Sequence, residues 1–275
     1  MKRRLPLPEC LEPASCDLPA LLKRLSLPTI RRLLDDTERI AVDHQMGHRE
    51  FLAHLVVAEV LNRDQTRMQR MTRHAHFPFL APVETLLFAP KGNLRRDLIA
   101  PFLALDYVAS GKHLILSGKT GRGKTALAIA IAIKAIQHGA DARFITAADL
   151  IDHLTGPAHR GELSTAVEPF IAAKVLIIDE IGYLPHAAEA ANVLYTIVEA
   201  RHRLKQPMIL TTNKPLKNWG SVLRDADLAE AILDRLLQDG RHIDIIGRSW
   251  RTGRTDDHAT VETAVAAAGV PAHDA

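Results

Sequence analysis

The chain has 275 residues, of which 47% are hydrophobic and 24% are charged, as is ordinary for a soluble globular protein. This length is enough for one domain of ordinary size plus a smaller one. The longest apolar run, residues 126–133, is too short to cross a bilayer, so we expect a cytoplasmic protein with no membrane partner.

Residues 1–17 are predicted to form a flexible leader. Three prolines interrupt the leader and leave no apolar run of the kind that a secretory signal requires. The only cysteines, Cys10 and Cys16, also lie in this leader. Two cysteines make neither a disulfide framework nor a metal site by themselves, which agrees with a reducing compartment.

Residues 18–82 are predicted to form a small, all-helical N-terminal domain. Apolar residues recur at spacings of three and four around Leu21–Leu34 and again around Leu52–Val60, and Pro78 and Pro82 close the pattern. Residues 20–96 hold 13 Lys and Arg against 8 Asp and Glu, a net charge of +5, whereas the whole chain carries only +3. Such a basic segment suits an anionic partner such as nucleic acid, although a solvated surface would have the same charge.

A row of cations follows within this helical segment. Arg63, Arg67, Arg70 and His74 are spaced by four, three and four residues, which aligns them on one helix face, and Arg73 flanks the row. We call these five residues the basic stripe. A stripe of this kind can follow a phosphate backbone without reading sequence, but a solvated helix face is the alternative. Because aromatic residues make up only 4% of the chain, base-stacking platforms are scarce, and duplex DNA is favoured over single strands.

Residues 83–251 are predicted to form an α/β domain. Residues 252–275 are predicted to be a disordered tail. Short apolar strands are expected at 114–117, 142–146, 175–179 and 208–212, with a last strand at 241–246. Near-continuous apolar strands that alternate with helices predict a parallel sheet covered on both faces, which is a three-layer αβα fold.

The first of these strands leads into a phosphate-binding motif. Residues 118–125 read GKTGRGKT and match G-x-x-x-x-G-K-[ST], between a strand and a helix as the motif requires. The backbone N–H groups of such a loop bind phosphates, its lysine reaches the β and γ phosphates, and its threonine binds Mg²⁺. Arg122 places an unusual cation in the loop. The nucleotide-binding residues predicted here are Gly118, Lys119, Thr120, Gly121, Arg122, Gly123, Lys124, Thr125 and Ala126.

Two later strands end in polar residues that suit the same chemistry. The strand VLII is followed by Asp179 and Glu180, and burying unpaired carboxylates for packing alone would be costly. We expect Asp179 to hold Mg²⁺ together with Thr125, and Glu180 to activate the attacking water, which favours hydrolysis over transfer to another acceptor. Asn213, after the strand MILTT, is placed to contact the water or the γ-phosphate.

These motifs together resemble those of AAA+ ATPases, and longer blocks resemble the IstB family. That family comprises the ATP-binding helpers of insertion-sequence transposition, which are relatives of the DnaC helicase loaders. The resemblance covers about residues 18–251 and rests on these blocks: VLIIDEIGYLP (175–185), TTNKPLKNWGSV (211–222), AILDRLL (231–237) and GRSWR (247–251).

The resemblance implies roles for two more arginines. Arg235 matches the arginine finger that one subunit supplies to its neighbour's nucleotide, and Arg251 matches an arginine that senses nucleotide state. It further implies self-association into a ring or helical oligomer, ATP and Mg²⁺ as cofactors, duplex DNA as a ligand and a transposase as the partner. The helical N-terminal domain would then serve DNA binding or oligomerisation.

Three other functions fit part of the sequence. A replicative helicase loader shares nearly all the ATPase motifs and would differ in its N-terminal region. A metabolic P-loop kinase would lack the Glu180 base and would carry an arginine-rich lid. A DNA-binding protein that does not hydrolyse ATP would have no need for Lys124, Thr125, Asp179 and Glu180 together.

Overall fold

The computed structural model describes residues 17–81, 96–182, 184 and 187–246. The predicted tail lies outside these residues, and so does the predicted leader apart from Asp17. The chain divides into two compact units, residues 1–69 and residues 70–275. Across the described helices, none has the length and apolarity needed to span a membrane.

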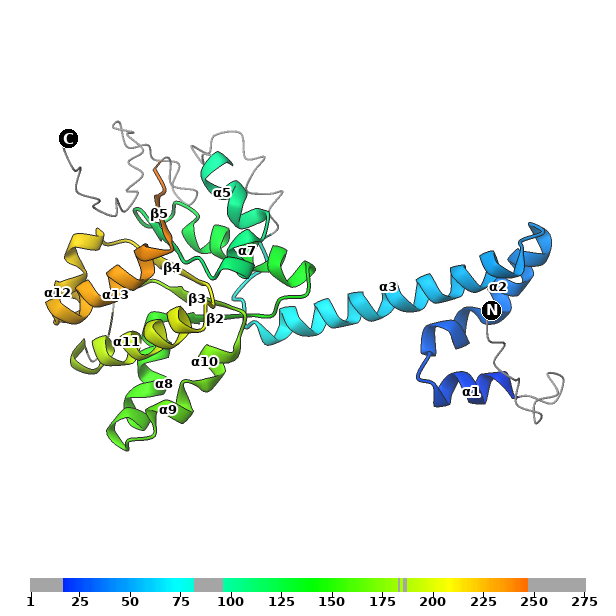
Figure 1. The fold of residues 1–275 in the computed structure, drawn as a ribbon, viewed down its shortest axis with the longest axis horizontal. Coiled ribbons are helices and arrows are strands. Elements are labelled where there is room, and N and C mark those ends of the chain that lie inside the picture. The colour runs from blue at the N-terminus through cyan, green and yellow to red at the C-terminus, as the bar shows by residue number, and fades with distance from the viewer. Residues whose placement is uncertain (1–16, 82–95, 183, 185–186, 247–275) are drawn as a thin grey trace, which may run out of the picture. The chain divides into compact units, whose positions relative to one another are not determined.

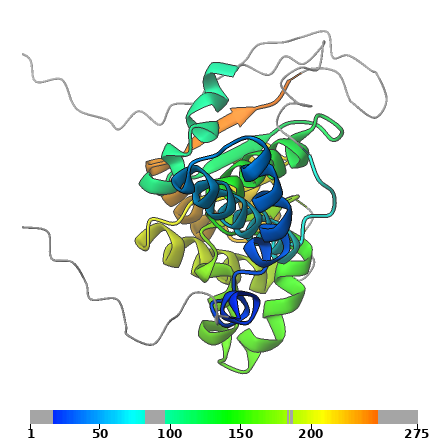
Figure 2. The same cartoon turned by 90° about the vertical axis from the view of Figure 1, so that its right-hand side faces the viewer.

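The first unit is helical. It contains α1 (Leu18–Arg24), α2 (Pro28–Asp43) and the beginning of α3 (His48–His74), drawn in blue to cyan in Figure 2. Leu22, Ile30 and Leu55 form its small buried core. The Glu59 carboxylate of α3 accepts hydrogen bonds from the backbone N–H groups of Thr29 (2.8 Å) and Ile30 (3.1 Å). Because these N–H groups lie in the first turn of α2 and have no partner within that helix, Glu59 caps α2.

The second unit is built on a five-stranded parallel sheet in the order β2-β3-β4-β1-β5. Four strands confirm the predicted ranges, and β5 ends two residues earlier than expected. Its last residue pairs with Ser117, where β1 itself ends and the phosphate loop begins. The strands are β1 (Leu114–Ser117), β2 (Ala142–Thr146), β3 (Val175–Asp179), β4 (Met208–Thr212) and β5 (Arg241–Asp244).

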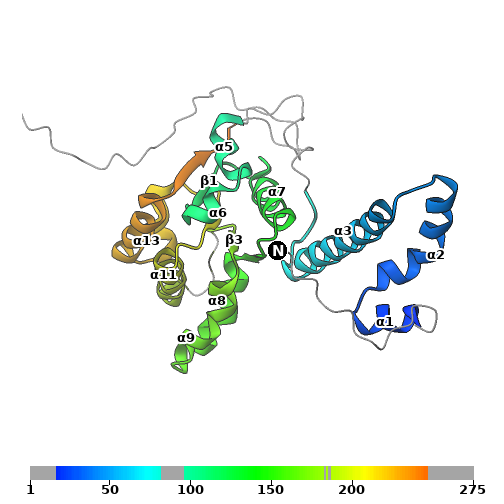
Figure 3. The ribbon, with the colours of Figure 1, turned by 45° about the vertical axis from the view of Figure 1, so that its right-hand side comes forward.

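Helices cover both faces of this sheet, as the sequence predicts. Figures 1 and 3 show α7 on one side of the strands and α11 and α13 on the other. Leu176 and Ile178 of β3 point into the core beneath α8, α11 and α13, while α7 packs on the opposite face. The helices are α5 (Arg96–Leu103), α6 (Asp106–Ser110), α7 (Lys124–Gln137), α8 (Ala147–His159), α9 (Leu163–Ala166), α10 (Glu168–Ala172), α11 (Ala187–Arg203), the 3-10 turn η2 (Leu216–Asn218), α12 (Trp219–Leu223) and α13 (Ala226–Gln238).

The end of α3 belongs to the second unit. The carbonyl of Ala75, which is fully buried, accepts a hydrogen bond of 2.8 Å from the backbone N–H of Phe144 in β2. Because β2 is an edge strand, this bond occupies a backbone group that the sheet leaves unpaired. The two compact units divide between residues 69 and 70, within α3. The predicted domain boundary at residues 82 and 83 stays a prediction.

Candidate functional site

The phosphate loop connects β1 to α7 in the conformation that the glycines predict. Gly118, Gly121 and Gly123 have φ values of 137°, 84° and 83°, which only glycine adopts at little cost. Gly123 precedes α7 and provides no side-chain cap, so the first-turn N–H groups of α7 remain available for an anion. The backbone therefore forms a cradle for phosphate.

Lys124 lies inside this cradle and is only 9% exposed. Its Nζ donates to the carbonyls of Gly118 (2.7 Å) and Lys119 (2.9 Å). Burial lowers the pKa of the Lys124 ammonium group, although the nearby Asp179 carboxylate partly opposes that shift. Nucleotide phosphates would replace the hydration that this buried cation has lost.

Asp179 lies at the end of β3 and faces the loop. It is 5% exposed and accepts hydrogen bonds from Thr125 Oγ1 (2.9 and 3.1 Å) and Thr211 Oγ1 (2.5 Å). A threonine hydroxyl beside an aspartate carboxylate is the oxygen donor set that Mg²⁺ takes when phosphates and water complete its shell. Thr125 and Asp179 therefore fit a magnesium ion.

Glu180 turns away from the sheet immediately after Asp179. Its φ of 62° is in the left-handed region, and its backbone N–H donates to Thr211 Oγ1 at 3.0 Å. A non-glycine residue held in this region stores strain, and such strain concentrates at functional sites. The turn places Glu180 on the wall of the same cavity as Lys124 and Asn213.

This cavity encloses about 590 Å³. The phosphate loop forms one wall, and the polar ends of β3 and β4 form another. A third wall contains Pro78, Phe79 and Phe144, which no sequence motif indicated. The structure thus brings together Lys124, Thr125, Asp179, Glu180 and Asn213, and their catalytic roles remain predictions.

The side chain of Arg122 points away from the phosphate loop, towards the residue that follows β5. It is 9% exposed, and its NH1 donates to the carbonyl of Ile245 at 3.1 Å. The neighbouring backbone is tied to the same place, because Ile245 N–H donates to Ser117 O at 2.8 Å and Ser117 Oγ donates to Asp244 at 2.8 Å. Arg122 thus anchors the loop to β5 through its guanidinium, and its own backbone remains part of the predicted phosphate cradle.

Arg235 lies on α13 and does not line the nucleotide cavity of its own chain. Its Nε forms an ion pair with Glu199 of α11, its NH2 donates to Tyr195 Oη at 3.0 Å, and its guanidinium lies 4.9 Å from the centre of the Tyr195 ring. The hydrogen bond that Arg235 donates to the Glu199 carboxylate raises the pKa of Arg235, which favours its charged form. Its side chain is 27% exposed, and Arg251, the second predicted arginine, lies outside the described residues.

The basic stripe follows the second half of α3. Arg67, Arg70, Arg73 and His74 are exposed. Arg63 differs, because it forms an ion pair of 2.8 Å with the buried Glu59 and also donates to Ser26 O. Arg63 therefore supports the fold of the first unit, although its side chain remains 54% exposed.

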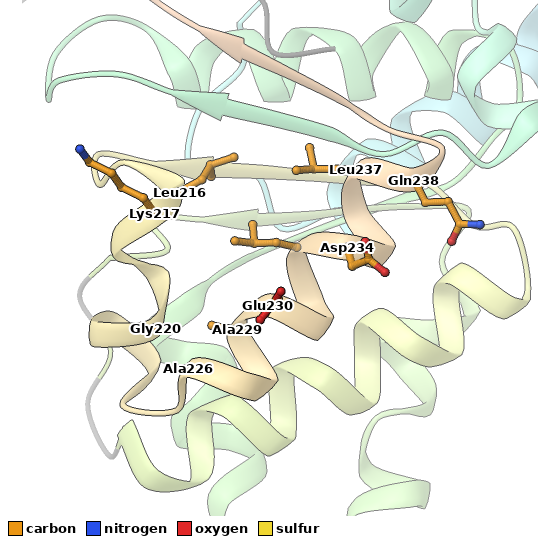
Figure 4. A pocket seen from close by; sticks show the side chains of 10 residues that line it. Leu216, Lys217, Gly220, Ala226, Ala229, Glu230, Asp234, Leu237 and Gln238 are labelled. Carbon is orange, nitrogen blue, oxygen red and sulfur yellow. The ribbon is translucent and has the colours of Figure 1, made fainter. Parts of the chain in front are cut away.

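A second cavity, which the sequence did not indicate, is a groove between η2, α12 and α13 (Figure 4). It encloses about 670 Å³, with Leu216, Leu233 and Leu237 among its apolar lining and with Glu230 and Asp234 on α13. Lys217 is the one cation among its lining residues, and the groove has no glycine loop to bind phosphate. It is therefore not a second nucleotide site of the P-loop kind.

The sheet order, the loop after β1 and the Asp-Glu pair after β3 define an AAA+ P-loop protein. The fold is similar to that of DnaA from Aquifex aeolicus bound to AMPPCP, with a TM-score of 0.51, 15% identity and coverage of 65% of this chain and 54% of that one. Within this class, the chain belongs to the family of IstB-like ATP-binding proteins, whose model matches residues 20–258.

Two relatives place the family in insertion sequences. The chain is 32% identical over 228 residues to the ATP-binding protein of insertion sequence IS5376 from Geobacillus stearothermophilus, which covers 83% of this chain and 90% of the relative. It is also 32% identical over 235 residues to the ATP-binding protein of insertion sequence IS21 from Pseudomonas aeruginosa. This match covers 86% of this chain and 88% of the relative. The predicted family and the predicted αβα fold are both confirmed.

Proposed function

We propose that this protein is an ATP-hydrolysing helper of insertion-sequence transposition that assembles on duplex target DNA, remodels it and recruits a partner transposase. The observation that supports this most directly is that Lys124, Thr125, Asp179, Glu180 and Asn213 line one cavity, in a chain of an insertion-sequence family. The chain works in the cytoplasm and supplies no cutting chemistry, which belongs to the transposase.

The mechanism follows from the positions of the side chains. The loop N–H groups and Lys124 bind the β and γ phosphates and stabilise the charge that moves onto them. Thr125 and Asp179 would hold Mg²⁺, which would supply further neutralisation of that charge. Glu180 accepts a proton from the attacking water, and Asn213 orients that water or the γ-phosphate.

Self-association completes the site. Arg235 lies away from the cavity of its own chain, which supports a role at the nucleotide of a neighbouring subunit. Leu52, Val56 and Val60 of α3 are 59%, 44% and 50% exposed and recur every four residues, so the first unit presents an apolar row of the kind that covers another protein surface. Both features agree with a ring or helical oligomer.

Changing Arg235 to alanine is expected to lower ATP hydrolysis by about 10³-fold or more, because a guanidinium in trans stabilises the charge of the transition state. Each subunit should still bind a slowly hydrolysed ATP analogue, since Arg235 does not line its own cavity. Steady-state phosphate release and analogue titration measure the two effects. Normal turnover in this variant would remove the arginine-finger assignment.

Because Arg235 also pairs with Glu199, a control must separate catalysis from folding. Glu199→Gln breaks the same ion pair but keeps the arginine, so it should retain turnover. A stricter control mixes Arg235→Ala subunits with Lys124→Ala subunits, each inactive alone. In the mixture, some interfaces join the intact phosphate loop of an Arg235→Ala subunit to the intact Arg235 of a Lys124→Ala subunit. These interfaces should recover hydrolysis, and no recovery would contradict an arginine finger that acts between subunits.

Duplex DNA is expected to bind in the presence of a slowly hydrolysed ATP analogue, with affinity that grows with DNA length. Because the stripe is proposed to contact phosphates, the double variant R70A/R73A should weaken binding equally for all DNA sequences. It should also reduce the slope of log K against log salt concentration by about two. Arg39→Ala, an arginine of α2 whose side chain is 79% exposed, is the matched control. Binding curves at several salt concentrations, with duplex and single strands of equal length, measure this.

The same experiment separates the candidate functions. A preference for single strands would favour a helicase loader over the transposition helper. Absence of binding to either form would make the stripe a solvated helix face and would leave an ATPase with a protein partner.

A further inference from the structure

The third wall of the nucleotide cavity comes from the segment that directly follows α3. Pro78 and Phe79 line the cavity together with Phe144 and Thr146 of β2 and with residues of the phosphate loop. Phe79 is 46% exposed, so much of its side chain is open to solvent. A bound nucleotide would cover part of this ring and remove apolar surface from water.

This segment is fixed to the same strand that lines the cavity. Ala75 is fully buried, and its carbonyl accepts the 2.8 Å hydrogen bond from Phe144 N–H. Phe144 therefore binds the segment through its backbone N–H, and Phe144 is also one of the residues that line the cavity. Residues 75–79 therefore connect the wall of the cavity directly to the end of α3.

Two arginines and a histidine of the basic stripe lie at that end of α3. Arg70, Arg73 and His74 are exposed and belong to the same compact unit as the nucleotide site. With a rise of 1.5 Å per residue, Arg70 lies only about 8 Å along the helix from Ala75. One short segment, residues 70–79, thus carries a wall of the ATP cavity and the cations predicted to contact DNA phosphates.

We propose that Phe79 is a positioning residue that couples the nucleotide cavity to the basic end of α3, so that bound ATP raises the affinity for DNA. Nucleotide packed against Phe79 would favour the arrangement of residues 76–79 that contacts it, and this arrangement would be transmitted through Ala75 to the end of α3 that carries Arg70 and Arg73. Linkage requires DNA to raise ATP affinity by the same factor. This inference rests on the proposed function, because it assumes that the basic stripe contacts DNA.

The test compares Phe79→Ala with Leu80→Ala, which removes the next apolar side chain. Leu80 is 66% exposed and is absent from the cavity lining, so it controls for loss of surface apolarity in the same segment. For each variant, the Kd of a duplex is measured at one salt concentration, without nucleotide and with a saturating, slowly hydrolysed ATP analogue. The ratio of the two Kd values is the coupling.

We expect wild type and Leu80→Ala to share one ratio of about fivefold or more, the usual range for coupled sites. Phe79→Ala should bring the ratio close to one while its Kd without nucleotide stays near the wild-type value. Phe79→Leu, which keeps an apolar side chain, should restore much of the ratio. The reciprocal measurement, analogue affinity with and without DNA, should change by the same factor.

Several outcomes would overturn the inference, and they differ from failure of the proposed function. A wild-type ratio above one that Phe79→Ala retains would exclude Phe79 as the coupling residue while leaving ATP-dependent DNA binding intact. An equal loss in Leu80→Ala would mean that the segment contributes only general apolar surface. A wild-type ratio of one would instead contradict the ATP-dependent DNA binding of the proposed function itself.

Discussion

Replacing Lys124 with alanine is expected to abolish tight ATP binding, the largest loss of nucleotide affinity that the site predicts. The Nζ of Lys124 now binds two loop carbonyls, at 2.7 and 2.9 Å, and these bonds hold it where the β and γ phosphates would lie. Each hydrogen bond from a charged group to phosphate is worth about 1.5–3 kcal/mol, so the loss of two corresponds to roughly 100-fold or more in Kd. Titration of a fluorescent ATP analogue measures it.

The control for this variant is Lys112→Ala. Lys112 is an exposed lysine before β1, at the end of the strand away from the phosphate loop, and its removal tests whether any lost cation lowers affinity. Because Lys124 also holds the loop together, thermal unfolding without nucleotide should be recorded for both variants. A folded Lys124→Ala protein with unchanged affinity would refute the phosphate-binding role of the loop.

The sheet and the phosphate loop were predictable because their signals are local. β1 and β3 are short apolar runs that each end in a polar residue, and the loop glycines occupy backbone conformations that other residues avoid. Asp179 is the last residue of β3 and Glu180 follows it directly, so the parallel sheet alone brings them to the end of the sheet where the loop lies. For these residues, spacing along the chain was sufficient.

Other features depend on partners that are remote in sequence. Arg122 was expected near the phosphates, but its direction is set by a carbonyl 123 residues away, at Ile245. Phe79 joins the cavity because residues 70–81 pack with the second unit, through the bond between Ala75 and Phe144. No periodicity or motif encodes such contacts. The ion pair between Arg235 of α13 and Glu199 of α11 could not be predicted for the same reason, because the two residues are far apart in the sequence.

Changing Glu180 to glutamine is expected to leave ATP binding intact and to lower hydrolysis by about 10²–10⁴-fold, the usual contribution of a general base. Glutamine has nearly the same volume and keeps the backbone N–H that donates to Thr211 Oγ1, so the strained turn should persist. It lacks only the carboxylate that accepts the proton of the attacking water. Single-turnover phosphate release, alongside analogue titration, separates the two effects.

The control for Glu180→Gln is Glu168→Gln, which neutralises an exposed glutamate in the first turn of α10, away from the cavity lining. It should hydrolyse ATP at the wild-type rate. Because the proposed function couples the ATP state to DNA, Glu180→Gln should also remain on duplex DNA longer with ATP itself than wild type does. Near-normal hydrolysis would exclude Glu180 as the base. Slow hydrolysis with unchanged residence on DNA would keep the base and would separate hydrolysis from DNA release.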